Sequence, residues 1–174
     1  SMVYDCVLLG RKPHIDVGVS VEDLAITSRA ISEMGLRDLA LEYADRISGG
    51  EFQKVQIARA LAQEPAVMMF DEPTNNLDIS NQHRTMEMIK AMVGRSGVCA
   101  IMTMHDINLA AHYSDALIFV RDGRLEAFGG KEVVTPELVR RVYGIDVDVI
   151  EHNGRPVIVP AVKQEEGRDA PQGL

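Results

Sequence analysis

The spacing of apolar and polar residues predicts that the first third of the chain is helical. Apolar side chains recur at helical intervals in four stretches, and glycine or proline closes three of them. Serine opens two of the stretches, where its hydroxyl can cap the free backbone N–H groups of a first helical turn. The predicted helices cover residues 4–9, 20–35, 36–43 and 48–63.

Two short apolar runs in the middle of the chain predict strands. They cover residues 66–70 and 98–103, and continuous apolar runs of this length are typical of parallel strands covered on both faces. An amphipathic helix is predicted between them, over residues 79–93. A strand, a helix and a strand at this spacing form a right-handed crossover unit with parallel strands.

Turn dipeptides divide the rest of the chain into two predicted hairpins. Asp122-Gly123 and Asn153-Gly154 each join two short strand-like runs, a pattern typical of antiparallel strands. The runs cover residues 116–121 with 124–128, and 147–151 with 156–159. Short helices are predicted over residues 106–113 and 136–143, and a loose polar tail over residues 163–174. The elements together predict an α/β protein.

The composition fits a folded domain in a reducing compartment. Apolar residues make up 46% of the chain and charged residues 25%. The 18 basic and 26 acidic residues give a net charge of −8, which argues against nucleic acid as a partner. No apolar run approaches the ~20 residues that span a bilayer, and no secretory signal is visible. Cys6 and Cys99 are predicted to be buried free thiols, as in a cytoplasmic protein.

Three ionisable residues follow the two predicted strands. Asp71 and Glu72 come directly after the first strand, and His105 comes almost directly after the second. The carboxyl ends of adjacent parallel strands meet at one edge of the sheet, where ligands bind. One interpretation is metal-assisted phosphoryl transfer, with one carboxylate near Mg²⁺, one that polarises a water, and the imidazole near a phosphate. The alternative is that the acids end ordinary strands and the histidine is structural.

The start of the helix at residue 48 is a second candidate. Ser48 and Glu51 have the spacing of a capping box, which by itself explains a helix start. Gly49 and Gly50 weaken the first turn, and they make sense if a ligand must approach the backbone closely. Free N–H groups at the positive end of the helix dipole suit a phosphate. The turn-rich residues 73–78 are a further candidate, or else a plain connecting loop.

Together these motifs resemble the ATP-binding-cassette (ABC) ATPase family. Their order and spacing match over residues 4–160: Ile47-Ser48-Gly49-Gly50-Glu51, then Met68-Met69-Phe70-Asp71-Glu72-Pro73-Thr74, then Asn76-Leu77-Asp78, then His105-Asp106. The resemblance implies a partial P-loop NTPase (RecA-like) parallel sheet core over residues 64–162. An α-helical subdomain that ends in the signature helix precedes it over residues 1–63, and the core ends in β-hairpins before a flexible tail at 163–174.

The resemblance also implies roles in binding ATP and Mg²⁺. Asp71 is similar to the Walker B aspartate, which supports Mg²⁺, usually through water. Glu72 is similar to the catalytic glutamate, which orients the attacking water. His105 is similar to the switch histidine, which contacts the γ-phosphate.

Two further roles concern a second copy of the subunit. Ser48, Gly49, Gly50 and Glu51 are similar to the ABC signature, which grips the γ-phosphate of ATP held by the other ATPase subunit of a homodimer. Asp78 is similar to the D-loop aspartate at the dimer interface.

A narrower resemblance concerns the transported substrate. The segments Val7-Leu8-Leu9-Gly10-Arg11 and Pro13-His14, with residues 105–111 and 113–115, are similar to ATPases of iron-siderophore, haem and cobalamin importers. Such a subunit lies at the inner face of the cell membrane. Its partners are the transmembrane permease subunits, expected to dock on residues 4–46, and indirectly a substrate-binding protein.

One motif of the family does not occur in the 174 residues. No G-x-x-x-x-G-K-[ST] pattern is present, and in the family this Walker A loop and the Q-loop glutamine precede the region of resemblance. The chain is therefore similar to the C-terminal fragment of such an ATPase. We expect it to show negligible ATP binding and turnover alone, and to expose an apolar sheet edge.

Two alternative functions remain open. The Asp-Glu-Pro-Thr-Asn-Asn-Leu-Asp run is shared by soluble ABC ATPases that act on the ribosome or DNA, although those proteins usually carry a different stretch after the histidine. A non-catalytic remnant, or interaction module, is the second alternative, and the missing Walker A motif favours it for this chain.

Overall fold

The computed structural model describes residues 1–161 and divides the chain into two compact units. The first unit is Ser1–Met104, and the second starts at His105. The subdomain boundary that the sequence predicts between residues 63 and 64 lies inside the first unit, and it stays a prediction. The predicted tail, residues 163–174, lies outside the described residues. The α/β fold class is confirmed, because the helices accompany short parallel and antiparallel strand pairs.

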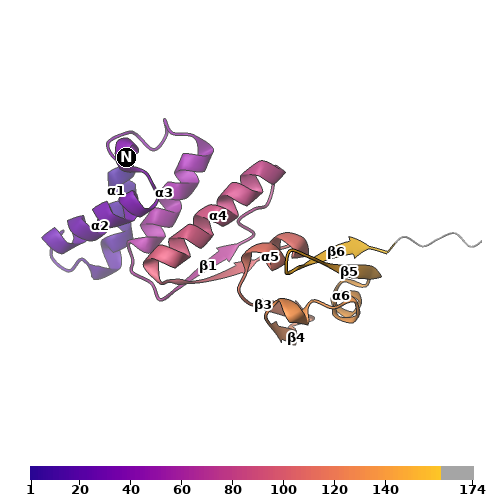
Figure 1. The fold of residues 1–174 in the computed structure, drawn as a ribbon. Helices are drawn as coiled ribbons and strands as arrows, with labels where there is room; N and C mark the ends of the chain where they lie inside the picture. The colour runs from indigo at the N-terminus through magenta and orange to yellow at the C-terminus, as the bar shows by residue number, and fades with distance from the viewer. Residues whose placement is uncertain (162–174) are drawn as a thin grey trace, which may run out of the picture. The chain divides into compact units, whose positions relative to one another are not determined.

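Three α-helices open the first unit (Figure 1). Helices α2 and α3 each begin behind a serine, whose hydroxyl accepts the N–H of the third helical residue while that residue's carboxylate accepts the serine N–H. Helix α1 packs against both α2 and α3. The bounds are α1 Val3–Leu8, α2 Val21–Glu33 and α3 Gly49–Leu61, with the 3-10 helices η1 Leu9–His14 and η2 Arg37–Leu39.

The helix predicted over residues 36–43 is wrong. Only the single 3-10 turn η2 forms there. The carbonyl groups of Ala40 and Glu42 accept the N–H groups of Tyr4 and Val3, both at 2.9 Å. These bonds satisfy free donors in the first turn of α1, so the segment serves as a cap and does not continue as a helix.

The middle of the chain forms the predicted strand-helix-strand unit. Strand β1, Val67–Asp71, pairs in parallel with β2, Cys99–Thr103, and helix α4, Ile79–Ser96, connects them. Helix α4 ends at Gly97, whose φ of 68° is the left-handed conformation that glycine tolerates. The register places Val67 opposite Cys99 and Asp71 opposite Thr103, so both strands end at the same level.

The β1–β2 pair is buried on one face within the first unit. Met68 is 6% exposed and packs with buried residues of α3 and α4, whereas Met69 is 81% exposed and Ile101 is 42% exposed. The prediction that both strand faces are covered is therefore wrong for this unit, because the face with Met69 and Ile101 is exposed. The exposed sheet edge stays a prediction. The core contains Val3, Val7, Ile31, Leu36, Val55, Ala58, Met68, Ile89 and Met92, among others.

The second unit combines two hairpins with two helices around its own core. The side-chain amide of Asn108 accepts the N–H of Ile158 at 2.8 Å and donates to its carbonyl at 3.1 Å, so it pairs with strand β6 as a neighbouring peptide would. The core contains Leu117, Phe119, Leu138, Val139 and Val147, among others. The bounds are α5 Ile107–Tyr113, β3 Leu117–Arg121, β4 Arg124–Gly129, η3 Lys131–Val133, α6 Pro136–Tyr143, β5 Val147–His152 and β6 Arg155–Pro160.

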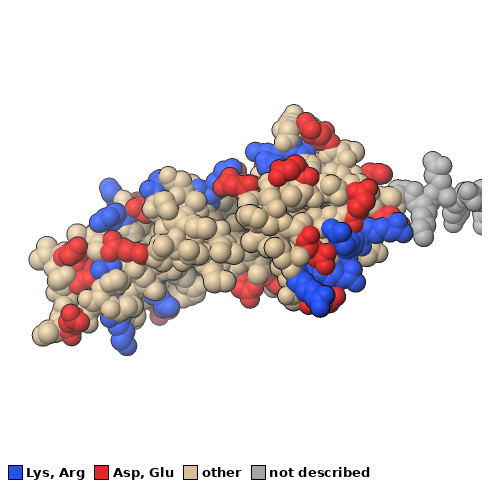
Figure 2. All heavy atoms as spheres, turned by 90° about the horizontal axis from the view of Figure 1, so that it is seen from below, with Lys and Arg blue, Asp and Glu red and all other residues tan. Residues whose placement is uncertain are grey.

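Surface properties agree in part with the sequence analysis. Both cysteines are free thiols, but the prediction that they are buried is wrong, because Cys99 is exposed on β2 and Cys6 is only partly buried. On the face that Figure 2 shows, Lys and Arg side chains lie next to Asp and Glu side chains. None of the helices in residues 1–161 has the length and apolar character needed to cross a membrane.

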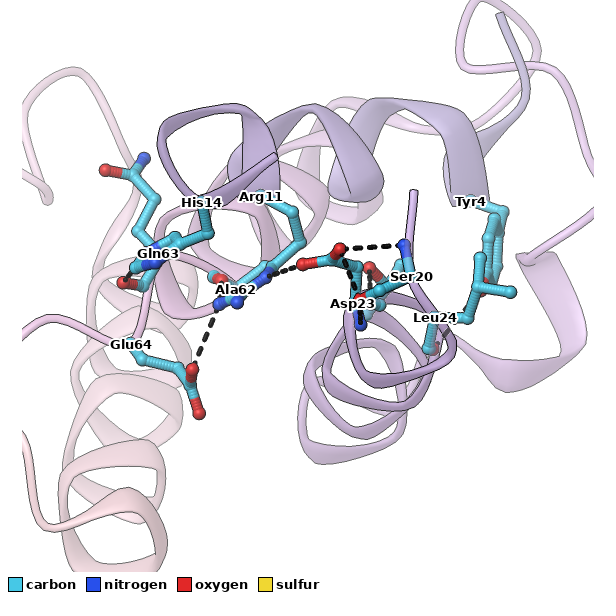
Figure 3. A network of polar contacts seen from close by, with 10 residues as sticks. Tyr4, Arg11, His14, Ser20, Asp23, Leu24, Ala62, Gln63 and Glu64 are labelled. Carbon is cyan, nitrogen blue, oxygen red and sulfur yellow. Dashed lines mark hydrogen bonds and ion pairs between the residues drawn. The ribbon is translucent and has the colours of Figure 1, made fainter. Parts of the chain in front are cut away.

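A buried arginine ties η1 to α2 and to the end of α3 (Figure 3). Arg11 is 5% exposed, and its Nε donates to Oδ1 of Asp23 at 2.9 Å. Its Nη1 donates to the Ala62 carbonyl at 2.8 Å and to Oε2 of Glu64 at 3.0 Å. A buried charge needs such partners, so the three segments are held together by one side chain.

The residue before this arginine lies unusually close to α3. A Cβ on Gly10 would lie 2.1 Å from the Arg59 carbonyl oxygen, whereas a Cβ on Gly94 in α4 would meet nothing within 4 Å. We predict that Gly10→Ala destabilises the protein by about 1–3 kcal/mol through overpacking. The matched control Gly94→Ala should stabilise it by up to ~1 kcal/mol. Urea unfolding measures both, and equal effects of the two substitutions would contradict the close packing.

The Asp23 carboxylate makes the stability of the first unit dependent on pH. The hydroxyl and backbone N–H of Ser20, and then the Arg11 guanidinium, lower the pKa of Asp23 from 3.8 to about 2. Between these values the unfolded chain binds a proton that the folded chain does not, so stability is present above the unfolded pKa and is lost as the pH falls towards 2. We predict that Asp23→Asn flattens the acid-unfolding curve in this window, measured by circular dichroism. An unchanged slope would contradict it.

Candidate functional site

The carboxyl end of β1 is built around a hydrogen-bonded threonine. The hydroxyl of Thr103, the last residue of β2, donates to Oδ1 of Asp71 at 2.6 Å. The oxygen of the Thr103 hydroxyl in turn accepts the backbone N–H of Glu72 at 3.0 Å. The two acidic residues are thus attached to the neighbouring strand at the point where β1 ends.

Glu72 has a backbone conformation that is uncommon for a residue with a side chain. Its φ is 45°, in the left-handed region, which costs on the order of 1–3 kcal/mol. The chain turns there, so that the Glu72 carbonyl accepts the Asn75 N–H at 3.0 Å, and Oε2 of Glu72 accepts the Asn75 side-chain amide at 2.9 Å. Strain of this kind persists only where neighbouring bonds hold the residue, and it is frequent in active sites.

The start of helix α3 is a closed capping box in this structure. Both the hydroxyl and the backbone N–H of Ser48 donate to Oε2 of Glu51, at 2.7 and 2.8 Å. These two bonds lower the pKa of Glu51, so the carboxylate is negatively charged at neutral pH. A Cβ on Gly49 or Gly50 would meet nothing within 4 Å, so local packing does not require either glycine. The predicted close approach of a ligand to these two glycines stays a prediction.

The loop after the acidic pair lies beside this helix start. One open groove of about 930 Å³ in the first unit is lined by Ser48, Gly49 and Gly50 together with Pro73, Asn75 and Leu77. At the end of the loop Asp78 caps α4, accepting the Asn81 N–H at 2.8 Å. The structure therefore brings the predicted helix-start site and the loop of residues 73–78 into one region. Asp78 also has a structural role there.

His105 belongs to the second unit. It is exposed and lies two residues after the end of β2, and Asp106 caps helix α5 by accepting the Leu109 N–H at 2.9 Å. Its predicted role beside a γ-phosphate stays a prediction. Among residues 1–161, no group of three or more His, Cys, Asp or Glu side chains is placed to hold a metal ion by itself.

The comparison with known proteins decides the family. The ABC transporter family model matches residues 9–75. An uncharacterized ABC transporter ATP-binding protein of Methanocaldococcus jannaschii is 49% identical over 91% of this chain and 62% of its own length. The ferric enterobactin transport ATP-binding protein of Escherichia coli is 37% identical over 97% of the chain and 62% of its own length. The chain belongs to the ABC transporter ATP-binding family.

Other relatives and a solved structure agree with this assignment. A hemin import and a cobalamin import ATP-binding protein are each 36% identical to the chain. A solved ABC transporter of metal-chelate type shares the fold, with a TM-score of 0.78 and 24% identity over 94% of the chain and 68% of its own length. The chain spans about three fifths of the length of the curated relatives that it matches.

The first unit contains the signature-like Ser48–Glu51 segment, the Walker-B-like Asp71 and Glu72, and the D-loop-like Asp78. Sequence reasoning missed Thr103 and Asn75, which hold the two acids. A signal for Thr103 was available, because a hydroxyl residue ends the second predicted strand at the level where the first strand turns acidic.

The end of β1 fits the Mg²⁺ that the ABC family implies. Mg²⁺ keeps several waters and is commonly held by one or two carboxylates plus the phosphates of a nucleotide. Asp71 is exposed at the strand end, and the Thr103 hydroxyl occupies only one of the roughly four acceptor positions of its carboxylate. The donor set therefore suits a partly hydrated metal and does not form a closed protein cage.

Proposed function

We propose that the chain forms the ATP-hydrolysing half-site of an ABC importer subunit. The observation that carries this proposal is the acidic pair Asp71 and Glu72, attached through Thr103 to the end of the parallel sheet. Phosphoryl transfer needs positioning and charge compensation more than covalent chemistry from the protein, and a rigid strand end provides positioning.

In the proposed reaction a water oxygen attacks the γ-phosphorus of ATP. The bond from that phosphorus to the β–γ bridging oxygen breaks, and the products are ADP, inorganic phosphate and a proton. Glu72 accepts a hydrogen bond from the attacking water and so orients it. Asp71 would hold Mg²⁺, which would compensate the phosphate charge when bound. His105 contacts the γ-phosphate.

The helix start at Ser48 acts on the nucleotide of a second copy. Its N–H groups and the helix dipole favour an anion, and the glycines leave room for one. The Ser48 hydroxyl has one proton, which it donates to Glu51 in this structure, so that bond must open before the hydroxyl can donate to a phosphate. Asp78 lies at the same proposed dimer interface.

The transported substrate is inferred from the relatives. Proteins named for ferric enterobactin, hemin and cobalamin import are among them, so we propose that an iron chelate, haem or cobalamin is taken up. The ATPase would work at the inner face of the membrane with transmembrane permease subunits and, through them, a substrate-binding protein.

The test uses a subunit of the relatives' length that contains these 174 residues. We predict MgATP hydrolysis that Glu72→Gln reduces at least about 10²-fold while ATP binding is kept, because the amide preserves the shape but loses the charge that orients water. The 174-residue chain alone should show negligible turnover, because it contains no Walker A motif.

Phosphate release and binding of a fluorescent ATP analogue measure the two properties separately. Full activity of the Glu72→Gln variant would contradict the role of Glu72. Hydrolysis by the 174-residue chain alone, abolished by the same substitution, would contradict the need for a Walker A segment.

A further inference from the structure

Thr103 lies beside both acidic residues of the proposed hydrolytic site. It is the last residue of β2 and pairs in register with Asp71, the last residue of β1. A threonine hydroxyl has one proton to donate and two lone pairs that accept. In this structure the proton goes to Oδ1 of Asp71, and the oxygen accepts the Glu72 N–H. One hydroxyl therefore contacts both acidic residues.

The two hydrogen bonds of the Thr103 hydroxyl fix different parts of the acidic residues: the side chain of Asp71 and the backbone of Glu72. The bond to Oδ1 fixes the rotation of the Asp71 carboxylate about its own axis and leaves other acceptor positions on that carboxylate. The bond from the Glu72 N–H holds the backbone at the point where φ becomes positive, at 45°. The Asn75 amide holds the far end of the same residue, because it donates to Oε2 of Glu72. The direction of the Glu72 side chain thus depends on a bond at each end.

We propose that Thr103 is a positioning residue for ATP hydrolysis, which sets the Asp71 carboxylate and the Glu72 backbone through a single hydroxyl. This inference rests on the function proposed above. It concerns residues of the first unit alone, since Asp71, Glu72 and Thr103 all lie within Ser1–Met104.

A purely structural threonine would behave differently. Thr103 and Asp71 are both exposed, so water can replace the two bonds in a variant that lacks the hydroxyl. Valine preserves the branched shape that strands favour, and so the stability of the sheet should be nearly unchanged. The geometry of the two acids should change, because water does not hold them in one orientation.

The test compares Thr103→Val with Thr103→Ser in a subunit of the relatives' length. We predict that Thr103→Val lowers kcat about 10- to 100-fold, the range found when partners that orient reactive groups are removed, with KM for ATP nearly unchanged. Thr103→Ser keeps the hydroxyl and should keep kcat within about threefold. The matched control is Cys99→Val, at the opposite end of the same strand and on the same face, which should leave kcat unchanged.

The possible outcomes separate the two proposals. If the unmodified subunit hydrolyses ATP and Thr103→Val retains its kcat, the role of Thr103 is wrong while the proposed function stands. If the unmodified subunit does not hydrolyse ATP, both are wrong. If Thr103→Val and a second variant, Thr103→Ala, unfold at lower temperature in proportion to their loss of activity, Thr103 is a structural residue and the inference is overturned.

Discussion

The parallel register of β1 and β2 is the constraint on which the site depends. It places Asp71 opposite Thr103, so β1, which ends in the acidic residue, and β2, which ends in the threonine, stop at the same level. Because side chains alternate along a strand, a shift of one residue would turn Thr103 to the other face and separate it from Asp71. The register is in turn fixed by burial, since Met68 must face the helices while Met69 faces away.

Helix starts in this ABC chain combine structural and functional roles. Ser48 and Asp78 both satisfy the free N–H groups of a first turn, and each belongs to a segment with a proposed role between two subunits. The same polar groups that stabilise a helix in isolation are therefore those that a nucleotide or a second copy would contact. In this structure Ser48 is bonded to Glu51, so the proposed contact with a nucleotide would compete with a bond that the protein already makes.

Much of the fold could be predicted from local pattern because its determinants are local. The capping serines, the terminating glycines and the turn dipeptides at residues 122–123 and 153–154 all act within a few residues of themselves. The predictions that were wrong depend on distant partners. Residues 36–43 do not form a helix, because two of their carbonyl groups accept N–H groups of α1. The exposure of Met69 depends on which elements cover the sheet.

The same distinction between local and distant determinants applies to the candidate site. Asp71, Glu72 and the Ser48 segment were predicted from motif order, because those motifs are contiguous in the sequence. Thr103 and the partners of Arg11 were missed, since they bond to residues 12 to 53 positions away and only the fold makes them neighbours. The role of His105 rests on the family resemblance, since His105 opens the second unit.

The central claim is that Glu72 of one copy and Ser48 of another act on the same nucleotide. It is tested most directly by mixing two inactive variants of a subunit of the relatives' length, Ser48→Arg and Glu72→Gln, under conditions in which dimers exchange. In a mixed symmetric dimer one site would contain both substitutions and the other neither, so the account predicts recovery of roughly a quarter of the unmodified ATPase activity. A mixture that stays as inactive as the separate variants would contradict it.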